Sequence, residues 1–354
     1  MTVSRTILIT AAGAPQSPTL IRHLKDNADG VPVRIVALDM NPEAVGRFFA
    51  DGFHVIPEAG ANGYRERILE IVEAERADAF LNVSGNDVPF IARLKPEIEA
   101  TGTVVLCCDA DVIDLVNDKY RLYETFRDDP GVSIPDFHWP KSLDEFIEIA
   151  AAMGYPDRDI CFKPHVSKGS RGFRILSERF DRRDLLLNYK PISRYMTLDD
   201  FVSIFRGHAD FPKLMLMELA EGEEIDAMTI GWEGNALLTT CKSRESNRWG
   251  VIDLGAHVDR PEIVKSVAAI CRRVPLRFNN SLQFIGGKLI EINPRTSTFI
   301  YQDDLNEPWL ALKLAMGMIG PDDVREFQPK VSMGRRMVRY MDQIFFDPDG
   351  TWQH

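Results

Sequence analysis

Four continuous apolar runs, separated by helical stretches, dominate the first third of the sequence. They cover residues 6–10, 33–39, 77–83 and 103–107, and an amphipathic helix is expected over residues 17–25. A continuous apolar run is typical of a parallel strand buried on both faces. Alternating strands and helices predict a doubly wound parallel sheet. We therefore expect an α/β protein whose first domain, residues 1–112, is Rossmann-like.

The first strand-to-helix turn bears on what this sheet binds. Residues 11–16 read Ala-Ala-Gly-Ala-Pro-Gln, and Asp39 ends the second strand. The full G-x-G-x-x-G fingerprint, which lets a backbone approach a pyrophosphate, is missing. A nicotinamide-dependent oxidoreductase is therefore a disfavoured alternative, with Asp39 as its supporting feature.

A loop rich in glycine, serine and cations lies in the second third of the chain. Lys163 precedes it on an expected strand, and residues 167–173 read Ser-Lys-Gly-Ser-Arg-Gly-Phe. Backbone N–H groups of such a loop can surround a polyphosphate, and Lys163, Lys168 and Arg171 would add positive charge. The simpler alternative is a mobile surface hairpin.

Acidic and polar stretches follow the expected strand at residues 214–220. Glu224 lies where an acid could accept hydrogen bonds from ribose hydroxyls, although a solvated acidic turn is the commoner role of such residues. Residues 242–250 are polar and long enough to move, which suits a lid or a substrate clamp.

Residues 282–295 predict a β-hairpin that carries polar groups in an apolar context. Glu291 and Asn293 share one face of its second strand, because successive side chains alternate faces. Gln283 joins them only if the loop has an odd length, so we expect a three-residue loop with a glycine bulge. Three oxygen ligands would then bind Mg²⁺ near Arg295. Alternatively, Asn-Pro ends a strand whose Glu291 is solvated.

Composition excludes several functional classes. The formal net charge of −11 and the absence of a Lys/Arg block argue against a nucleic-acid partner. Five cysteines without metal-ligand spacing predict reduced core thiols and a cytoplasmic protein. No window approaches the roughly 18 apolar residues of a membrane span, so we expect no membrane partner.

Several motifs occur in an order that resembles the ATP-grasp superfamily, most of all members similar to the large subunit of carbamoyl-phosphate synthase. The matching residues are Asn117-Asp118-Lys119, Phe162-Lys163-Pro164, 169–172, 218–224 and 283–295. The resemblance implies a Rossmann-like pre-ATP-grasp domain before a two-lobed α+β ATP-grasp domain. Its first lobe would cover residues 113–210 and its second 211–326, followed by a tail, 327–354, that resembles a closing strand.

The resemblance also implies roles for individual residues and the cofactors ATP and Mg²⁺ (or Mn²⁺). ATP would be bound by Lys119, Lys163, Lys168, Gly169, Ser170, Arg171, Gly172, Glu218, Leu219 and Glu224, with Glu218 and Leu219 at the adenine and Glu224 at the ribose. Gln283, Glu291 and Asn293 would bind the metal, and Arg295 would stabilise the transferred phosphoryl group.

The implied function is a ligase that activates a carboxylate as an acyl phosphate and lets an amine attack it, releasing ADP and phosphate. Residues 295–298 read Arg-Thr-Ser-Thr, without the second arginine of the carbamoyl-phosphate enzymes, so an organic acid is favoured over bicarbonate. Arg244 is a candidate clamp for that acid because arginine binds carboxylates bidentately. A salt bridge between a lid and the surface is the equal alternative for Arg244.

The partners would be small-molecule acids and amines, with a possible homodimer. The rival function is a non-catalytic ATP-binding regulatory or accessory protein.

Overall fold

The computed structural model describes residues 4–167, 169, 171–188, 193–208, 210–248, 251–296, 305–347 and 351–352. The chain divides into two compact units. The first unit consists of Met1–Asp114, Glu224–Gln283 and Ile292–His354, and the second of Leu115–Glu223 and Phe284–Glu291. The chain therefore passes between the units several times.

The first unit begins with a parallel sheet of five strands. The strands are β1 (Arg5–Ile9), β2 (Val33–Asp39), β3 (Gly52–Val55), β4 (Ala79–Leu81) and β5 (Val104–Leu106), in the order β3-β2-β1-β4-β5. All four strand pairings are parallel, which confirms the predicted α/β sheet. Strand β3 was not predicted, because its four residues are half-buried or exposed and form no continuous apolar run.

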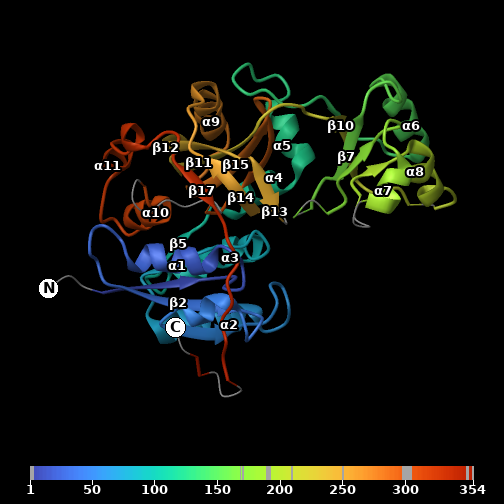
Figure 1. The fold of residues 1–354 in the computed structure, drawn as a ribbon. Coiled ribbons are helices and arrows are strands. Elements are labelled where there is room, and N and C mark those ends of the chain that lie inside the picture. The colour runs from blue at the N-terminus through green and yellow to red at the C-terminus, as the bar shows by residue number, and fades with distance from the viewer. Residues whose placement is uncertain are drawn as a thin grey trace. The chain divides into compact units, whose positions relative to one another are not determined.

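Helices cover both faces of this sheet. They are α1 (Ser17–Lys25), the 3₁₀ helix η1 (Val45–Phe48), α2 (Tyr64–Glu75) and α3 (Val88–Glu99), followed by α4 (Ala110–Asn117). Figure 1 shows α1 and α2 on opposite faces of the blue sheet. Helix α1 has the predicted bounds because Leu20, Ile21 and Leu24 recur at helical spacing and are fully buried against the sheet.

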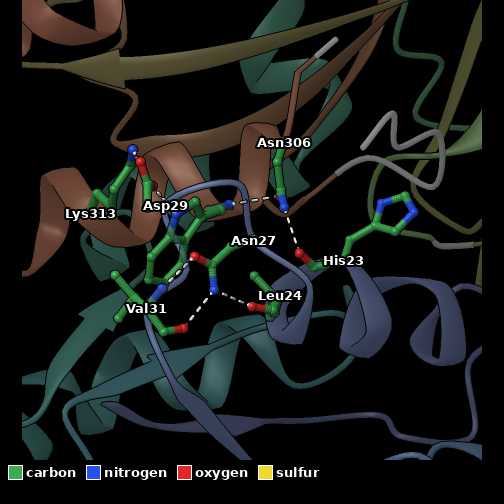
Figure 2. Close-up of polar contacts among 8 residues, drawn as sticks. His23, Leu24, Asn27, Asp29, Val31, Asn306 and Lys313 are labelled. Atoms are coloured by element: carbon green, nitrogen blue, oxygen red, sulfur yellow. Dashed lines mark hydrogen bonds and ion pairs between the residues drawn. The ribbon is translucent and has the colours of Figure 1, made fainter. Parts of the chain in front are cut away.

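Helix α10 (Glu307–Ala315) packs on this domain through polar contacts as well as apolar ones (Figure 2). The Asn306 amide donates to the backbone oxygen of His23 at 2.7 Å. Farther along the helix, Trp309 Nε1 and Lys313 Nζ both donate to Asp29 Oδ2, at 2.5 and 2.7 Å. The backbone of His23 in α1 and Asp29 in the loop after α1 thus hold the two ends of α10.

The rest of the first unit is largely antiparallel. Its elements are β11 (Glu224–Trp232), β12 (Asn235–Ser243), β13 (Ser246–Arg248), β14 (Val251–Ala256), α9 (Pro261–Arg273), α11 (Pro321–Arg325), η2 (Gln328–Lys330) and β17 (Arg336–Val338). Strands β15 (Phe278–Ile285) and β16 (Lys288–Asn293) complete a sheet of order β12-β11-β15-β16, and their hairpin tip groups with the second unit.

Two expectations about this region are settled by its strands. Residues 242–250 are not a polar lid along their whole length, because Lys242 and Ser243 are buried in β12 and Ser246–Arg248 pair with β14. The last two of these residues lie outside the described part. The predicted closing strand in the tail is confirmed as β17, which pairs antiparallel with β14.

The second unit includes residues 115–210 of the first expected lobe and continues to Glu223. Its elements are α5 (Lys119–Phe126), β6 (Phe137–His138), α6 (Leu143–Ala152), β7 (Ile160–Pro164), β8 (Arg174–Leu176), α7 (Arg182–Asn188), β9 (Tyr195–Met196), α8 (Leu198–Phe205) and β10 (Leu214–Glu218). The sheet order is β6-β10-β7-β8-β9, and its core includes Phe146, Phe162 and Phe201. Thr197 caps α8 as predicted, accepting a hydrogen bond from the Asp200 amide.

No helix among the described residues is long and apolar enough to cross a membrane.

Candidate active site

Two buried lysines form the centre of the candidate site in the second unit. Lys119 begins α5, and its Nζ donates to the backbone oxygen of Ser167 at 2.6 Å. Lys163 lies on β7, and its Nζ donates to the backbone oxygen of Ile290 at 3.2 Å. The Lys119 amide also bonds to the backbone oxygen of His165, so α5 is attached to the end of β7.

One carboxylate, Glu291, interacts electrostatically with both lysines. Burial lowers the pKa of Lys163 to about 8, and Glu291 opposes that shift while Lys119 adds to it. Burial also lowers the pKa of Lys119, again opposed by Glu291 and by Asp118. Glu291 thus lies beside both ammonium groups and Asp118 beside that of Lys119, and a polyphosphate ligand would favour the charged form of both lysines.

The predicted phosphate loop follows these lysines directly. Gly169 and Gly172 have φ values of +61° and +76°, which favour glycine. A Cβ at Gly172 would lie 2.6 Å from Cγ of Pro164, so the loop returns very close to the end of β7. Arg171 is exposed. Lys168 and Ser170 lie outside the described residues.

The hairpin that carries Glu291 differs from prediction in its loop. Only Gly286 and Gly287 separate β15 from β16, with φ values of +54° and +80°. Two successive positive φ values match a two-residue primed turn, which follows the strands' natural twist. The expected three-residue loop with a bulge is therefore wrong. Half-buried Glu291 and Asn293 still flank the buried Ile292.

A two-residue turn puts the side chains of Gln283 and Glu291 on opposite faces of the hairpin. The argument that placed Gln283 beside Glu291 required a loop of odd length and therefore no longer applies. The Gln283 amide instead donates to Oε1 of Glu224. Gln283 as a metal ligand stays a prediction. Among the described residues, no group of three His, Cys, Asp or Glu side chains could hold a metal ion.

Glu224, the predicted ribose ligand, begins β11 and binds two neighbours. Its Oε1 accepts from Gln283 and lies 2.9 Å from Nε of Arg244. Within the described part of the chain, no hydrogen bond to Oε2 of Glu224 is found. Arg244 is largely buried, with a side chain 13% exposed, so this ion pair is not a bridge from a lid to the surface.

Glu218 and Leu219, the predicted adenine residues, end β10. Both carboxylate oxygens of Glu218 lie 2.6 Å from Nζ of Lys288 at the hairpin tip. Although burial raises the pKa of Glu218, hydrogen bonds from Lys288 and the Asp136 amide outweigh burial and lower it. The Glu218 side chain is thus engaged, and so is its backbone, because its amide donates to the backbone oxygen of Asp136 at 2.9 Å and its backbone oxygen accepts from Cys161 Sγ at 3.6 Å. Leu219 is half-buried.

The structure groups the predicted residues by unit. Lys119, Lys163, Gly169, Arg171, Gly172, Glu218, Leu219 and Glu291 lie in the second unit, and Glu224, Arg244, Gln283, Asn293 and Arg295 in the first. Arg295 is half-buried and donates from Nη1 to the backbone oxygen of Thr296 at 3.0 Å. Glu224, Arg244 and Gln283 contact one another in the first unit, and Lys119, Lys163 and Glu291 interact in the second.

Sequence reasoning missed three residues in contact with these clusters or adjacent to them. Lys288 binds Glu218, and a buried ion pair joins Lys242 to Glu307. Lys242 lies two residues before Arg244. Because side chains two residues apart in a strand point to the same face, the sequence could have predicted Lys242 on the face of Arg244. Nothing in the sequence pointed to Glu307, which lies far along the chain.

Asp39, the feature that supported an oxidoreductase, accepts hydrogen bonds from backbone amides. Its Oδ2 accepts from the Gly13 amide at 2.7 Å, and its Oδ1 from the Asn41 amide at 2.9 Å. A ribose-binding acid needs a free acceptor oxygen, whereas both oxygens here stabilise loops. This arrangement further disfavours a nicotinamide site.

Solved structures of similar fold cover most of the chain. Biotin carboxylase from Campylobacter jejuni, in complex with a β,γ-ATP compound, aligns with a TM-score of 0.66 and 15% identity over 94% of this chain and 74% of its own. N5-carboxyaminoimidazole synthetase from Staphylococcus aureus aligns with a TM-score of 0.63 and 14% identity over 91% and 80%. The chain has the ATP-grasp fold.

A third ATP-grasp neighbour carries ligands. The biotin carboxylase domain dimer of 2-oxoglutarate carboxylase from Hydrogenobacter thermophilus, solved with MgADP, ADP and bicarbonate, aligns with a TM-score of 0.63. It is 19% identical, over 94% of this chain and 73% of that chain. At such identities the likeness shows the ATP-grasp fold and leaves the substrates open.

Sequence comparisons match parts of the chain. Residues 7–106 match the family described as the PylC-like N-terminal domain. The carbamoyl phosphate synthase large chain of Pseudothermotoga lettingae is 26% identical over 170 residues, covering 43% of this chain and 15% of that protein. The Halobacterium salinarum protein of the same description is 26% identical over 204 residues, covering 55% and 18%. The chain thus spans less than a fifth of the length of these relatives.

Proposed function

We propose that this protein is an ATP- and Mg²⁺-dependent ligase. It activates a carboxylate as an acyl phosphate, joins it to an amine in an amide or peptide-type bond, and releases ADP and phosphate. The observation that carries this proposal is the pair of buried lysines, Lys119 and Lys163, around Glu291 at the start of a glycine-rich loop. The ATP-grasp fold and the ATP-dependent relatives support it.

Charge neutralisation is the main requirement of this reaction. Phosphoryl transfer needs positioned cations more than a nucleophilic side chain, because negative charge spreads over the transferred oxygens. Lys119 and Lys163 supply buried positive charge, and Lys119 donates to the backbone oxygen of Ser167, where the glycine-rich loop begins. In our proposal Lys168, Gly169, Ser170, Arg171 and Gly172 cover the phosphates, and Arg295 stabilises the transferred group.

Two of the three proposed metal ligands, Glu291 and Asn293, suit a magnesium ion. Glu291 and Asn293 are half-buried, share one strand and offer hard oxygen ligands, with Gln283 as the predicted third. Magnesium bound there with ATP would neutralise phosphate charge and polarise the γ-phosphoryl group. Glu291 also has the lysines as electrostatic partners, so it would orient the phosphates relative to both cations.

The remaining residues would bind the nucleoside and the acid. Oε2 of Glu224 accepts ribose hydroxyl protons, while Oε1 stays with Gln283 and Arg244. Glu218 and Leu219 lie at the adenine, and Lys288 holds the Glu218 carboxylate at this strand end. Arg244 clamps the carboxylate of the acid.

We also propose the domain boundaries after residues 112, 210 and 326, and a homodimer as in the Hydrogenobacter structure.

Turnover separates this function from a non-catalytic ATP-binding protein. A panel of organic acids and amines is screened for ADP release with MgATP. The ligase requires ADP release that depends on both an acid and an amine, and Glu291→Ala should abolish it while leaving the circular dichroism spectrum unchanged. ATP binding without such release supports the regulatory alternative. Normal turnover by Glu291→Ala would contradict the metal assignment.

A further inference from the structure

A second row of polar side chains lies beside the cluster of Arg244, Glu224 and Gln283. Residues two apart in a strand point to the same face. Each member of the first cluster has a polar residue two positions away: Asp226 on β11, Ser281 on β15, and Lys242 on β12, the strand that Arg244 directly follows. Asp226 and Lys242 are register partners. We call Lys242, Asp226 and Ser281 the second row.

The second row is buried and bonded across strands. Ser281 Oγ donates to Oδ1 of Asp226 at 2.5 Å, joining β15 to β11. The contact between Gln283 and Glu224 joins the same two strands, two residues away on each strand. The two strands are therefore cross-linked by side chains at both positions.

Lys242 is fully buried and rests on helix α10. Its Nζ donates to Oε1 and Oε2 of Glu307 at 2.9 and 2.7 Å, and Thr240 Oγ1 donates to the same carboxylate. Figure 2 shows that the helix beginning at Glu307 is held at Asn306 by the backbone of His23 in α1, and at Lys313 by Asp29 in the loop after α1. The second row is thus supported by a helix with fixed ends.

A buried charge or hydroxyl without a hydrogen-bond partner lowers the free energy of unfolding. When all the groups of such a buried network are paired, the network makes the surrounding residues rigid. We propose that the second row positions Glu224, so that its free oxygen meets the ribose of the nucleotide and the site distinguishes ribose from deoxyribose. Ser281 and Lys242 are positioning residues, since they act through β11 and β12. This inference rests on the proposed role of Glu224.

The test compares ATP with 2′-deoxy-ATP and 3′-deoxy-ATP, each with Mg²⁺, by isothermal titration calorimetry. A hydrogen bond to a charged group contributes about 1.5–3 kcal/mol, so the wild type should prefer ATP over at least one analogue by about tenfold or more. Ser281→Ala should reduce that preference to about threefold or less. The loss should appear in ATP affinity, with affinity for the deoxy analogue nearly unchanged.

Ser17→Ala is the matched control. Ser17 is buried, as Ser281 is, and its hydroxyl donates to the backbone oxygen of Ala11 at 2.9 Å. The variant loses a similar hydrogen bond in the same unit, away from Glu224. It should keep the wild-type preference for ATP, whereas an equal loss in Ser17→Ala would show that the effect reflects general destabilisation and would overturn the positioning role.

A second variant keeps the test decisive if Ser281→Ala does not fold. Lys242→Met combined with Glu307→Leu replaces the buried pair by apolar side chains of similar volume, a change that proteins often tolerate. It should reduce the ATP preference in the same way.

The outcomes separate this inference from the proposed function. If the wild type shows no preference for ribose, the role of Glu224 itself is wrong. If the wild type discriminates and a folded Ser281→Ala or double variant discriminates equally, Glu224 keeps its role and the positioning inference is overturned.

Discussion

Lys163 donates a hydrogen bond from Nζ to the backbone oxygen of Ile290, the residue immediately before Glu291. The lysine thereby lies beside the strand that carries the proposed metal ligand, and Tyr123 donates to the same carbonyl at 3.0 Å. A charged group held this way loses little freedom when a ligand arrives, which is the advantage of a preorganised site.

Removing this charge should impair catalysis more than folding. Lys163→Met keeps most of the apolar stem and removes the ammonium group, so the transferred phosphoryl group loses one fixed cation. By analogy with deleting a preorganised donor, the rate of ADP release should fall by about 10²–10³-fold. Lys213→Met, which changes an exposed lysine of the same unit, serves as the control and should retain the wild-type rate.

Nucleotide binding should take up protons at alkaline pH. The pKa of Lys163 is lowered by burial to about 8, so this lysine is charged below pH 8 and mostly neutral above it. Phosphates favour the charged form, and binding at pH 9 should therefore restore a proton. Calorimetry in two buffers of different ionisation enthalpy should detect uptake of up to about one proton, strongly reduced in Lys163→Met. Uptake that is equal in both proteins would contradict the assignment.

The lowered pKa of Lys163 also changes how the free energy of unfolding depends on pH. Between pH 8 and the ordinary lysine pKa of 10.5, the unfolded chain binds more protons at Lys163 than the folded chain does. This group alone therefore makes the free energy of unfolding rise with pH in that window. Urea titrations at pH 8 and pH 10 should show a smaller gain, or a larger loss, for Lys163→Met than for the wild type.

The hairpin tip offers a matched pair of glycines. A Cβ at Gly286 would lie 2.1 Å from the backbone oxygen of Glu221, whereas a Cβ at Gly287 meets nothing within 4 Å. Both have positive φ, so each substitution by alanine costs about 1–2 kcal/mol of backbone strain. Gly286→Ala should lower the melting temperature clearly more than Gly287→Ala, and should also weaken ATP binding because the chain after Leu219 must move. Equal effects of the two variants would show that this contact is not constrained.

Breaking the buried ion pair should be costly. Lys242→Met leaves Glu307 without its cation in an apolar environment, and such losses typically reduce the free energy of unfolding by about 3–5 kcal/mol. Urea unfolding monitored by circular dichroism measures the change. The double variant with Glu307→Leu should recover much of it, since no unpaired charge remains. A single variant as stable as the wild type would show that the pair contributes little.

Much of the fold was predictable because it depends on local patterns. The bounds of α1 and β2 follow directly from apolar periodicity, and the cap at Thr197 from its local sequence. Strand β3 was not predicted because its four residues are half-buried or exposed and form no continuous apolar run. The hairpin was predicted but its loop was not, since Gly-Gly permits several turn types and sequence alone does not choose among them.

For the candidate site, the sequence by itself determined the order of motifs: the lysines before the glycine-rich loop, the acidic strand end, and Glu291 with Asn293 around a buried isoleucine. Only the tertiary structure decided the partners. Arg244 pairs with Glu224, Lys288 with Glu218, and Lys242 with Glu307 across 65 positions of the chain. The physical reason is that strand periodicity is local, whereas the partner of a buried charge depends on which distant segment packs against it.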